Sequence, residues 1–189
     1  MPKTKKICKL CQKLRDIKFF ETPKSLYCID CKKHAKTQKR KQASKVTKKK
    51  AWTAFSTYIR IRDSLKTTST IDECVCITCG KRVPYKKIQA GHYIGGRGNS
   101  VLFDERIVNG QCSRCNIILK GNYDAYNLVM LKKYSKKEIL KMLEKKKERK
   151  INTSQDYLDI EEKYKQKTKE LLEKNREKLR QKASKICKD

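Results

Sequence analysis

Apolar side chains are scarce along this chain and gather in a few short stretches. Within residues 51–63, Trp52, Phe55, Tyr58 and Ile59 recur at the spacing of one helix face, which predicts a short amphipathic helix. This face has two interpretations: it packs against the central part of the chain, or Trp52 stacks on a nucleic-acid base. Packing is the commoner role of such a face, and we favour it.

Two further helices are predicted in residues 135–189. Ser135 and Glu138 form a capping-box pattern that opens the first of them. The second runs from about residue 155 to 184, and its thin apolar stripe comprises Tyr157, Ile160, Tyr164, Leu171, Leu172, Leu179 and Ile186. The stripe would dock on the earlier helix of the same chain or on a second copy in a homodimer, and both alternatives stay open.

The central part combines strand and helix signals. Residues 88–93 predict a short strand that ends in His92, and the Gly-rich run 95–100 predicts a loop. A short helix is expected to follow and to stop at Gly121. Together with the helices on either side, this pattern indicates a small α+β fold.

The charge of the chain favours a polyanionic partner. The formal net charge is +30, from 50 Lys and Arg against 20 Asp and Glu. Residues 32–50 hold ten basic residues and no acidic one, so this stretch is a linker that binds phosphates or, alternatively, a solubilising spacer. The basic residues that we expect to contact DNA are Lys39, Arg40, Lys41, Lys48, Lys49, Lys50, Arg97, Arg106 and Arg114.

An anionic membrane surface is the rival partner for so basic a chain. No apolar run is long enough to span a bilayer, and no signal-peptide pattern opens the sequence. We therefore expect a cytoplasmic protein with no membrane partner and no small-molecule substrate.

Eight of the ten cysteines occur as CxxC pairs. With a hydrophobic content of 37%, the chain cannot build one large core, and metals stabilise small domains of this kind in a reducing compartment. Two pairs complete a tetrahedral Zn²⁺ shell, so two structural zinc sites are predicted. They comprise Cys8, Cys11, Cys28 and Cys31, and Cys76, Cys79, Cys112 and Cys115.

The central zinc site is expected to bring His92, at the end of a strand, near Asn116, at the start of a helix. This layout is typical of ββα-metal nucleases. Hydrolysis of a phosphodiester needs a base, and neutral imidazole suits pH 7. It also needs a divalent cation, Mg²⁺ or Mn²⁺, which oxygen ligands such as Asn116 bind. The alternative is a structural or DNA-contacting role for His92.

The chain resembles the phage NinG (also called Rap) family of recombination proteins, and its centre more distantly resembles HNH nucleases of the endonuclease VII type. The resemblance looks nearly full length. The segments that carry it are the N-terminal cysteines, the basic linker, AFSTYIRIRD (54–63), CITCG (76–80), AGHY (90–93), LFDER (102–106), QCSRCN (111–116), KGN (120–122) and a charged C-terminal helix.

The resemblance implies a DNA endonuclease that acts on recombination intermediates such as Holliday junctions and D-loops, in the cytoplasm of the host cell. It implies His92 as the general base, Asn116 as a metal ligand and zinc in the central cysteine site. Where the family has a carboxylate three residues before the histidine, this chain has Gln89, whose amide is a weaker candidate ligand of the catalytic cation. Where the family has an N-x-H pattern, it has Ile107 and Asn109, and Asp104 or Glu105 is a candidate for the missing carboxylate.

The sequence therefore predicts four parts: an N-terminal zinc module (1–31), a basic linker with an amphipathic helix (32–69), an HNH-like zinc domain (70–134) and a basic helical extension (135–189). A metal-dependent, structure-selective endonuclease is the first hypothesis. A non-catalytic zinc-finger DNA-binding protein of recombination is the second, and Gln89 favours it. A thiol–disulfide oxidoreductase is a weak third, because no thioredoxin-like pattern surrounds the cysteines.

Overall fold

The computed structural model describes residues 5–22, 24–95 and 98–186, and it confirms an α+β fold. The chain divides into two compact units, one ending at Thr47 and one beginning at Lys48. The finer boundaries predicted at residues 31, 69 and 134 stay predictions.

The N-terminal unit is built around four cysteines. Strand β1 (Lys5–Ile7) pairs antiparallel with β2 (Leu14–Asp16), and a 3₁₀ turn, η1 (Ile17–Phe19), follows. Phe20 is 5% exposed and packs against Cys8 and Cys28, which are fully buried. Because this core is so small, the cysteine cluster must supply much of what holds the unit together.

Helix α1 (Ile29–Thr68) runs without interruption from the N-terminal unit into the second unit. The sequence predicted a basic linker followed by a short helix, and the structure has one helix through both. Residues 29–68 contain neither Gly nor Pro and are rich in Lys, Ala, Gln and Arg, which all favour helix. The helix ends where Ser69 takes a left-handed conformation with a φ of 60°.

The second unit holds two small antiparallel sheets. Strand β3 (Glu73–Val75) pairs with β4 (Arg82–Pro84), which leads through a 3₁₀ turn, η2 (Tyr85–Lys87), into β5. Strand β5 (Ile88–His92) pairs with β6 (Val108–Cys112), and all five residues of β6 are buried. Thus the predicted strand that ends in His92 is confirmed.

Helices cover the β5–β6 hairpin and form its core. After β6 the chain forms a π-helical turn, η3 (Arg114–Ile118), then α2 (Tyr123–Lys133), α3 (Lys136–Lys145) and α4 (Ser154–Ile186). The core residues of these elements and of α1 are Phe55, Tyr58, Ile59, Tyr126, Met130, Ile139, Met142 and Tyr164. The predicted apolar face of residues 51–63 is therefore a packing face.

The predicted capping box of α3 is present. The Ser135 hydroxyl accepts a hydrogen bond from the Glu138 N–H, and the Glu138 carboxylate accepts one from the Ser135 N–H. Thr153 and Asp156 form the same reciprocal pair at the start of α4. These contacts satisfy N–H groups that the first turn of a helix otherwise leaves without partners.

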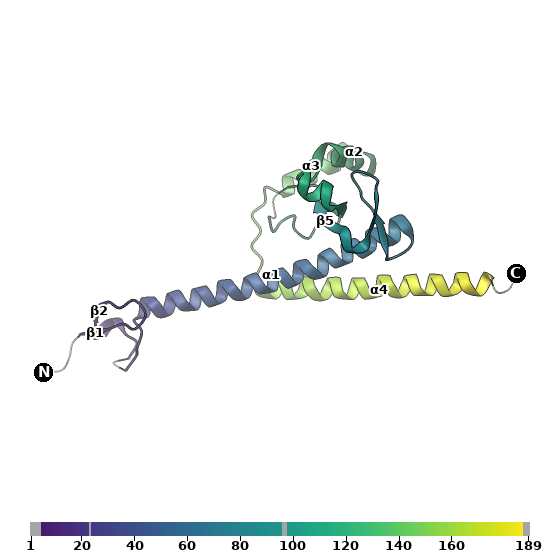
Figure 1. Ribbon diagram of the computed structural model, residues 1–189. Coiled ribbons are helices and arrows are strands. Elements are labelled where there is room, and N and C mark those ends of the chain that lie inside the picture. The colour runs from purple at the N-terminus through teal and green to yellow at the C-terminus, as the bar shows by residue number, and fades with distance from the viewer. Residues whose placement is uncertain (1–4, 23, 96–97, 187–189) are drawn as a thin grey trace. The chain divides into compact units, whose positions relative to one another are not determined.

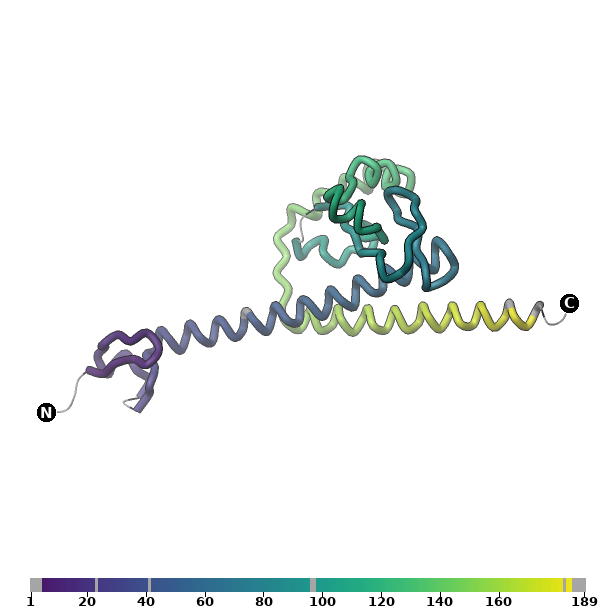
Figure 2. The backbone as a smooth tube through the Cα atoms, in the orientation of Figure 1, coloured from purple at the N-terminus to yellow at the C-terminus, as the bar shows by residue number. Residues whose placement is uncertain are grey.

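Helix α4 lies along the part of α1 that belongs to the second unit (Figure 1). The chain leaves α3 through an extended segment that brings it back to α1 (Figure 2). The Tyr164 ring meets Phe55 edge-on, with 4.7 Å between ring centroids, and Ile160 and Leu171 pack against the same core. This part of the apolar stripe docks within its own chain, whereas Leu179 is exposed and the Ile186 side chain lies outside what the structure describes. Within residues 5–22, 24–95 and 98–186, none of the helices is long and apolar enough to cross a membrane.

Candidate functional site

The central cysteines meet as the sequence predicts. The sulfur atoms of Cys76, Cys79, Cys112 and Cys115 all lie within 4.8 Å of one another, and those of Cys79 and Cys112 are 3.8 Å apart. A tetrahedral Zn²⁺ ion with Zn–S bonds of about 2.3 Å separates its ligand atoms by about 3.8 Å. The group therefore fits a structural zinc ion.

Hydrogen bonds favour the thiolate form of Cys76, whereas burial and the neighbouring cysteines raise the pKa values of Cys79 and Cys112. The Cys112 N–H donates to the Cys76 sulfur at 3.2 Å, and the Thr78 hydroxyl lies 3.2 Å from the same sulfur. Burial raises the pKa of Cys76, but these hydrogen bonds outweigh burial and lower that pKa to about 6. Gly80 closes the turn after Cys79 with a φ of 68°, a conformation that favours glycine.

The N-terminal cysteines form a second group of the same kind. The sulfur atoms of Cys8, Cys11, Cys28 and Cys31 also lie within 4.8 Å of one another. Burial raises the pKa of Cys8, yet backbone hydrogen bonds from Cys11 and Cys28 lower it to about 6. Cys74 is buried but belongs to neither group, as expected for a spare cysteine.

His92 occupies the end of β5 with its ring held from two sides. Its Nε2 lies 3.2 Å from the carbonyl oxygen of Leu102. Its ring stacks on Trp52 of α1, with 5.1 Å between centroids and 18° between planes. A carbonyl can only accept a hydrogen bond, so this contact is a hydrogen bond in the tautomer whose Nε2 carries the proton.

Asn116 lies on η3 directly after the zinc ligand Cys115, and its amide meets Gln89 of β5. The Asn116 Nδ2 donates to the Gln89 Oε1 at 2.7 Å. This contact joins the edge of β5 to the turn that carries Cys115, one of the four central cysteines. With Nδ2 engaged, the Asn116 Oδ1 is the atom of this amide that can bind a cation.

A shallow groove of about 270 Å³ runs along this edge of β5. It is lined by Trp52, Ser56, Arg60, Ile88, Gln89, Ala90 and Asn116. Trp52 connects the parts of the site, because its ring stacks on His92 and also lines the groove with Asn116. The groove therefore holds an amide oxygen and the Arg60 cation, while His92 does not line it and is connected to it through Trp52.

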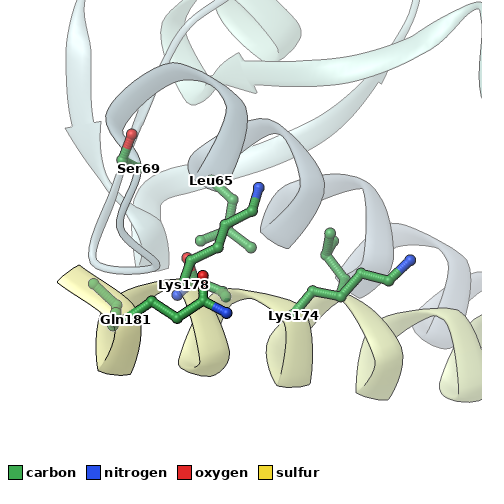
Figure 3. A pocket seen from close by; sticks show the side chains of 8 residues that line it. Leu65, Ser69, Lys174, Lys178 and Gln181 are labelled. Carbon is green, nitrogen blue, oxygen red and sulfur yellow. The ribbon is translucent and has the colours of Figure 1, made fainter. Parts of the chain in front are cut away.

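A second cavity, of about 500 Å³, lies away from these residues between the end of α1 and α4. Leu65 and Ser69 face it from α1, and Lys174, Lys178 and Gln181 from α4 (Figure 3). It holds no acid or imidazole among its lining residues, and we assign it no chemistry.

Asp104, the candidate carboxylate ligand, is engaged in ion pairs. Arg106 binds both of its oxygens, at 2.9 and 2.6 Å, and Lys145 approaches to 3.1 Å. Burial raises the pKa of Asp104, but these cations and hydrogen bonds outweigh burial and hold it at about 2. Asp104 does not line the groove of Asn116.

The other departures from the family pattern have structural roles. Ile107 is fully buried in the core. The Asn109 amide is 3% exposed, donates to the Tyr126 hydroxyl at 3.0 Å and accepts from Lys133 at 3.2 Å. Both residues therefore stabilise the hairpin behind the site.

Most of the candidate DNA-contacting residues are exposed to solvent. Lys39, Arg40, Lys49, Lys50, Arg106 and Arg114 are exposed. Lys48 is half-buried and donates to Asn99 at 2.8 Å. Arg97 lies outside the described residues, and Lys41 is described only as part of the α1 backbone.

Sequence reasoning missed two residues of the site, Arg60 and Gln111. Arg60 lies eight residues after Trp52 on the same helix, so helical periodicity could have placed it beside the groove. The Gln111 side chain is fully buried and donates to the Gly121 carbonyl at 2.8 Å, while its Oε1 fills the space where Gly91 lacks a Cβ. No local sequence pattern predicts a contact of this kind.

One comparison with known proteins gives a match. The family model described as "Bacteriophage Lambda NinG protein" matches residues 29–177. The match begins at the first residue of α1, so it leaves out Cys8, Cys11 and Cys28, which the sequence analysis had placed within the resemblance. No curated protein and no solved structure matches the chain.

Proposed function

The chain belongs to the family of the bacteriophage lambda NinG protein, and on this premise we propose that it is a metal-dependent DNA endonuclease acting on branched intermediates of phage recombination. The observation that carries the proposal is the hydrogen bond between His92 Nε2 and the Leu102 carbonyl. In the tautomer that donates from Nε2, the proposal assigns the role of base to Nδ1. Gln89 of the same strand holds the Asn116 amide.

In this proposal His92 is the general base. A water molecule attacks the phosphorus atom, its proton passes to His92 Nδ1, and the bond from phosphorus to the leaving 3′ oxygen breaks. The Leu102 carbonyl stabilises the imidazolium that forms, because it accepts the Nε2 proton. Trp52 keeps the ring in one orientation by stacking on it.

Asn116 Oδ1 is the proposed protein ligand of a divalent cation, and Gln89 orients the amide. Mg²⁺ keeps several waters and commonly takes further ligands from substrate phosphates, so one amide oxygen is compatible with a site that the DNA completes. When bound, the cation would neutralise charge on the phosphate and the leaving oxygen. The ion pairs of Asp104 with Arg106 and Lys145 lead us to leave Asp104 out of this site.

DNA is the proposed partner because of the charge, and branched DNA because of the family. Exposed basic residues such as Lys39 and Arg40 suit phosphate contacts, which do not depend on base sequence. The groove beside β5 adds the Arg60 cation next to the proposed reaction centre.

The experiment compares cleavage of a labelled four-way junction and a linear duplex of the same sequence, with Mg²⁺, with Mn²⁺ and without divalent cation. We expect the wild type to cut the junction in either metal and to spare the duplex. His92→Ala should lower the rate at least about 100-fold, because general-base catalysis contributes that much. Its zinc content should equal that of the wild type. Cleavage by His92→Ala at the wild-type rate would overturn the assignment.

A second candidate function is a non-catalytic zinc protein that binds recombination intermediates. Gln89 favours it, because a neutral amide binds Mg²⁺ more weakly than the carboxylate of the family pattern. The variant Gln89→Asp separates the two candidates. If the wild type is a nuclease with weakened cation binding, Gln89→Asp should cut at a Mg²⁺ concentration about tenfold lower; if neither protein cuts while both bind the junction, the second function holds.

A further inference from the structure

Three consecutive aliphatic side chains project into water beside the proposed reaction centre. Ile117 is 61% exposed, Ile118 is 73% exposed and Leu119 is 44% exposed. They follow Asn116 directly, on the turn that also carries the zinc ligand Cys115. Exposed aliphatic groups are common singly, but a contiguous set at a functional site indicates a binding surface.

This exposure is built into the fold. The chain turns back through Lys120, Gly121 and Asn122, which all have left-handed φ values, of 47°, 103° and 47°. Left-handed conformations at two non-glycine residues are unfavourable and persist only where surrounding contacts impose them.

The contacts that impose this turn come from the zinc site and the hairpin. The Asn122 side chain donates to the Cys115 sulfur at 3.5 Å, and the Gly121 N–H donates to the Cys115 carbonyl at 2.9 Å. Gln111, buried in β6, donates to the Gly121 carbonyl at 2.8 Å. The backbone that carries the isoleucines is thus held in place by these contacts, and the turn has little freedom to fold back and cover their side chains.

The charge around the isoleucines points to DNA rather than to another protein surface. The sequence from Arg106 to Tyr123 contains no acidic residue, and Arg114 and Lys120, on either side of the isoleucines, are exposed. Duplex DNA buries its base faces, but a branch point exposes the face of the last base pair between phosphates. An apolar tip flanked by cations complements that combination.

We propose that Ile117 and Ile118 form a wedge that packs on the exposed base pair at a DNA branch point and so confers the preference for branched over linear DNA. Since Asn116 precedes the wedge, the phosphate bound at the groove would lie close to the branch. The inference rests on the DNA-binding part of the proposed function and names the feature of the substrate that is recognised.

The test measures binding rather than cleavage, in buffer without Mg²⁺ and without chelator. The full chain with Ile117→Gln and Ile118→Gln is compared with the wild type on a four-way junction and on a linear duplex. Leu128→Gln, which removes an equally exposed leucine from α2, is the matched control. Zinc content verifies the fold of each protein, and 2-aminopurine placed at the branch reports unstacking by its fluorescence.

We expect the double variant to lose about tenfold in affinity for the junction, because burial of an aliphatic side chain contributes at least that factor. Duplex affinity should stay within about twofold, since phosphate contacts dominate it. The 2-aminopurine signal should rise with the wild type and Leu128→Gln and stay flat with the double variant.

An unchanged ratio of junction to duplex affinity in the double variant would overturn the wedge, as would a wild type without junction preference. An equal loss with Leu128→Gln would also count against it. Failure of the nuclease proposal is a separate result, because a wild type that prefers the junction through these isoleucines but never cuts it supports the wedge alone.

Discussion

The carboxylate of Asp104 is a structural ion-pair partner. It lies between Arg106 and Lys145, and its side chain is 8% exposed, so water competes little for its oxygens. It links the loop after His92 to α3, which belongs to the core of the second unit. This placement makes it a residue whose loss should affect stability more than catalysis.

We predict that Asp104→Asn lowers the free energy of unfolding by about 1 kcal/mol at pH 7. The pKa of Asp104 in the folded protein is about 2, below the ordinary value of 3.8. Its contribution is therefore fully present above about pH 4 and is lost as the pH falls toward 2. Urea unfolding of both proteins from pH 7 down to about pH 3 should give a constant difference that shrinks only at the acid end.

At this scale the sequence is informative where a residue's role depends on local spacing. The eight paired cysteines could be assigned because CxxC spacing alone brings two sulfurs to one ion. Asp104 and Gln111 could not, because their partners Lys145 and Gly91 lie far away in the sequence and meet them only after folding. Gln89 was weighed as a metal ligand, whereas its contact with Asn116 favours an orienting role.

Among the elements, the η3 turn depends most directly on metal. It carries Cys115 and Asn116 between strand β6 and helix α2, and few apolar contacts hold it, since most of its residues are exposed. A zinc ion held by the four cysteines would therefore position Asn116 against Gln89.

We predict that Cys112→Ser reduces the zinc content from two ions to one per chain, because three thiolates bind zinc far more weakly than four. The unfolding midpoint should fall by about 10 °C or more. Cys74→Ser is the matched control, because Cys74 is buried in the same region but ligates nothing. A colorimetric zinc assay and a thermal melt of both variants would decide it; equal zinc in the two would contradict the assignment.

The helices show what element-level patterns can and cannot predict. The capping box at Ser135 and the long α4 were predictable, because caps and periodicity are local. The continuity of α1 was not, because its first half has no apolar face, and only the absence of Gly and Pro allows the helix to extend. The π-helical form of η3 was also missed, because a backbone hydrogen bond from the Leu119 N–H to the Arg114 carbonyl defines it, and no sequence pattern predicts that bond.

The whole molecule carries a net charge of +30 on 189 residues. In the proposed association with DNA, counterion release would therefore dominate the binding free energy, and salt would weaken binding strongly. We predict that Lys39→Gln with Arg40→Gln reduces the slope of log affinity against log salt by about 2, since each lost phosphate contact removes about 0.9.

Lys165→Gln is the control for this measurement. Lys165 pairs with Glu161 at 2.7 Å, so its charge is already compensated and its removal should leave the slope nearly unchanged. Fluorescence anisotropy with a linear duplex at several salt concentrations gives the slope for the wild type, for the double variant and for Lys165→Gln. Equal slopes for all three proteins would show that residues 39 and 40 do not contact phosphates.

The docking of α4 on α1 affects the order in which parts of the chain fold. Strands β5 and β6 are separated only by residues 93–107, whereas Phe55 meets Tyr164 roughly a hundred residues later in the sequence. Contacts between residues that are close in sequence form sooner, so the β5–β6 hairpin should assemble during synthesis, before α4 has been synthesised. Until α4 is synthesised, Phe55 and Tyr58 remain partly exposed to solvent. Chaperones and proteases recognise exposed apolar surfaces of this kind. The docking of α4 thus converts a nascent chain that chaperones and proteases can bind into a folded chain whose core is covered.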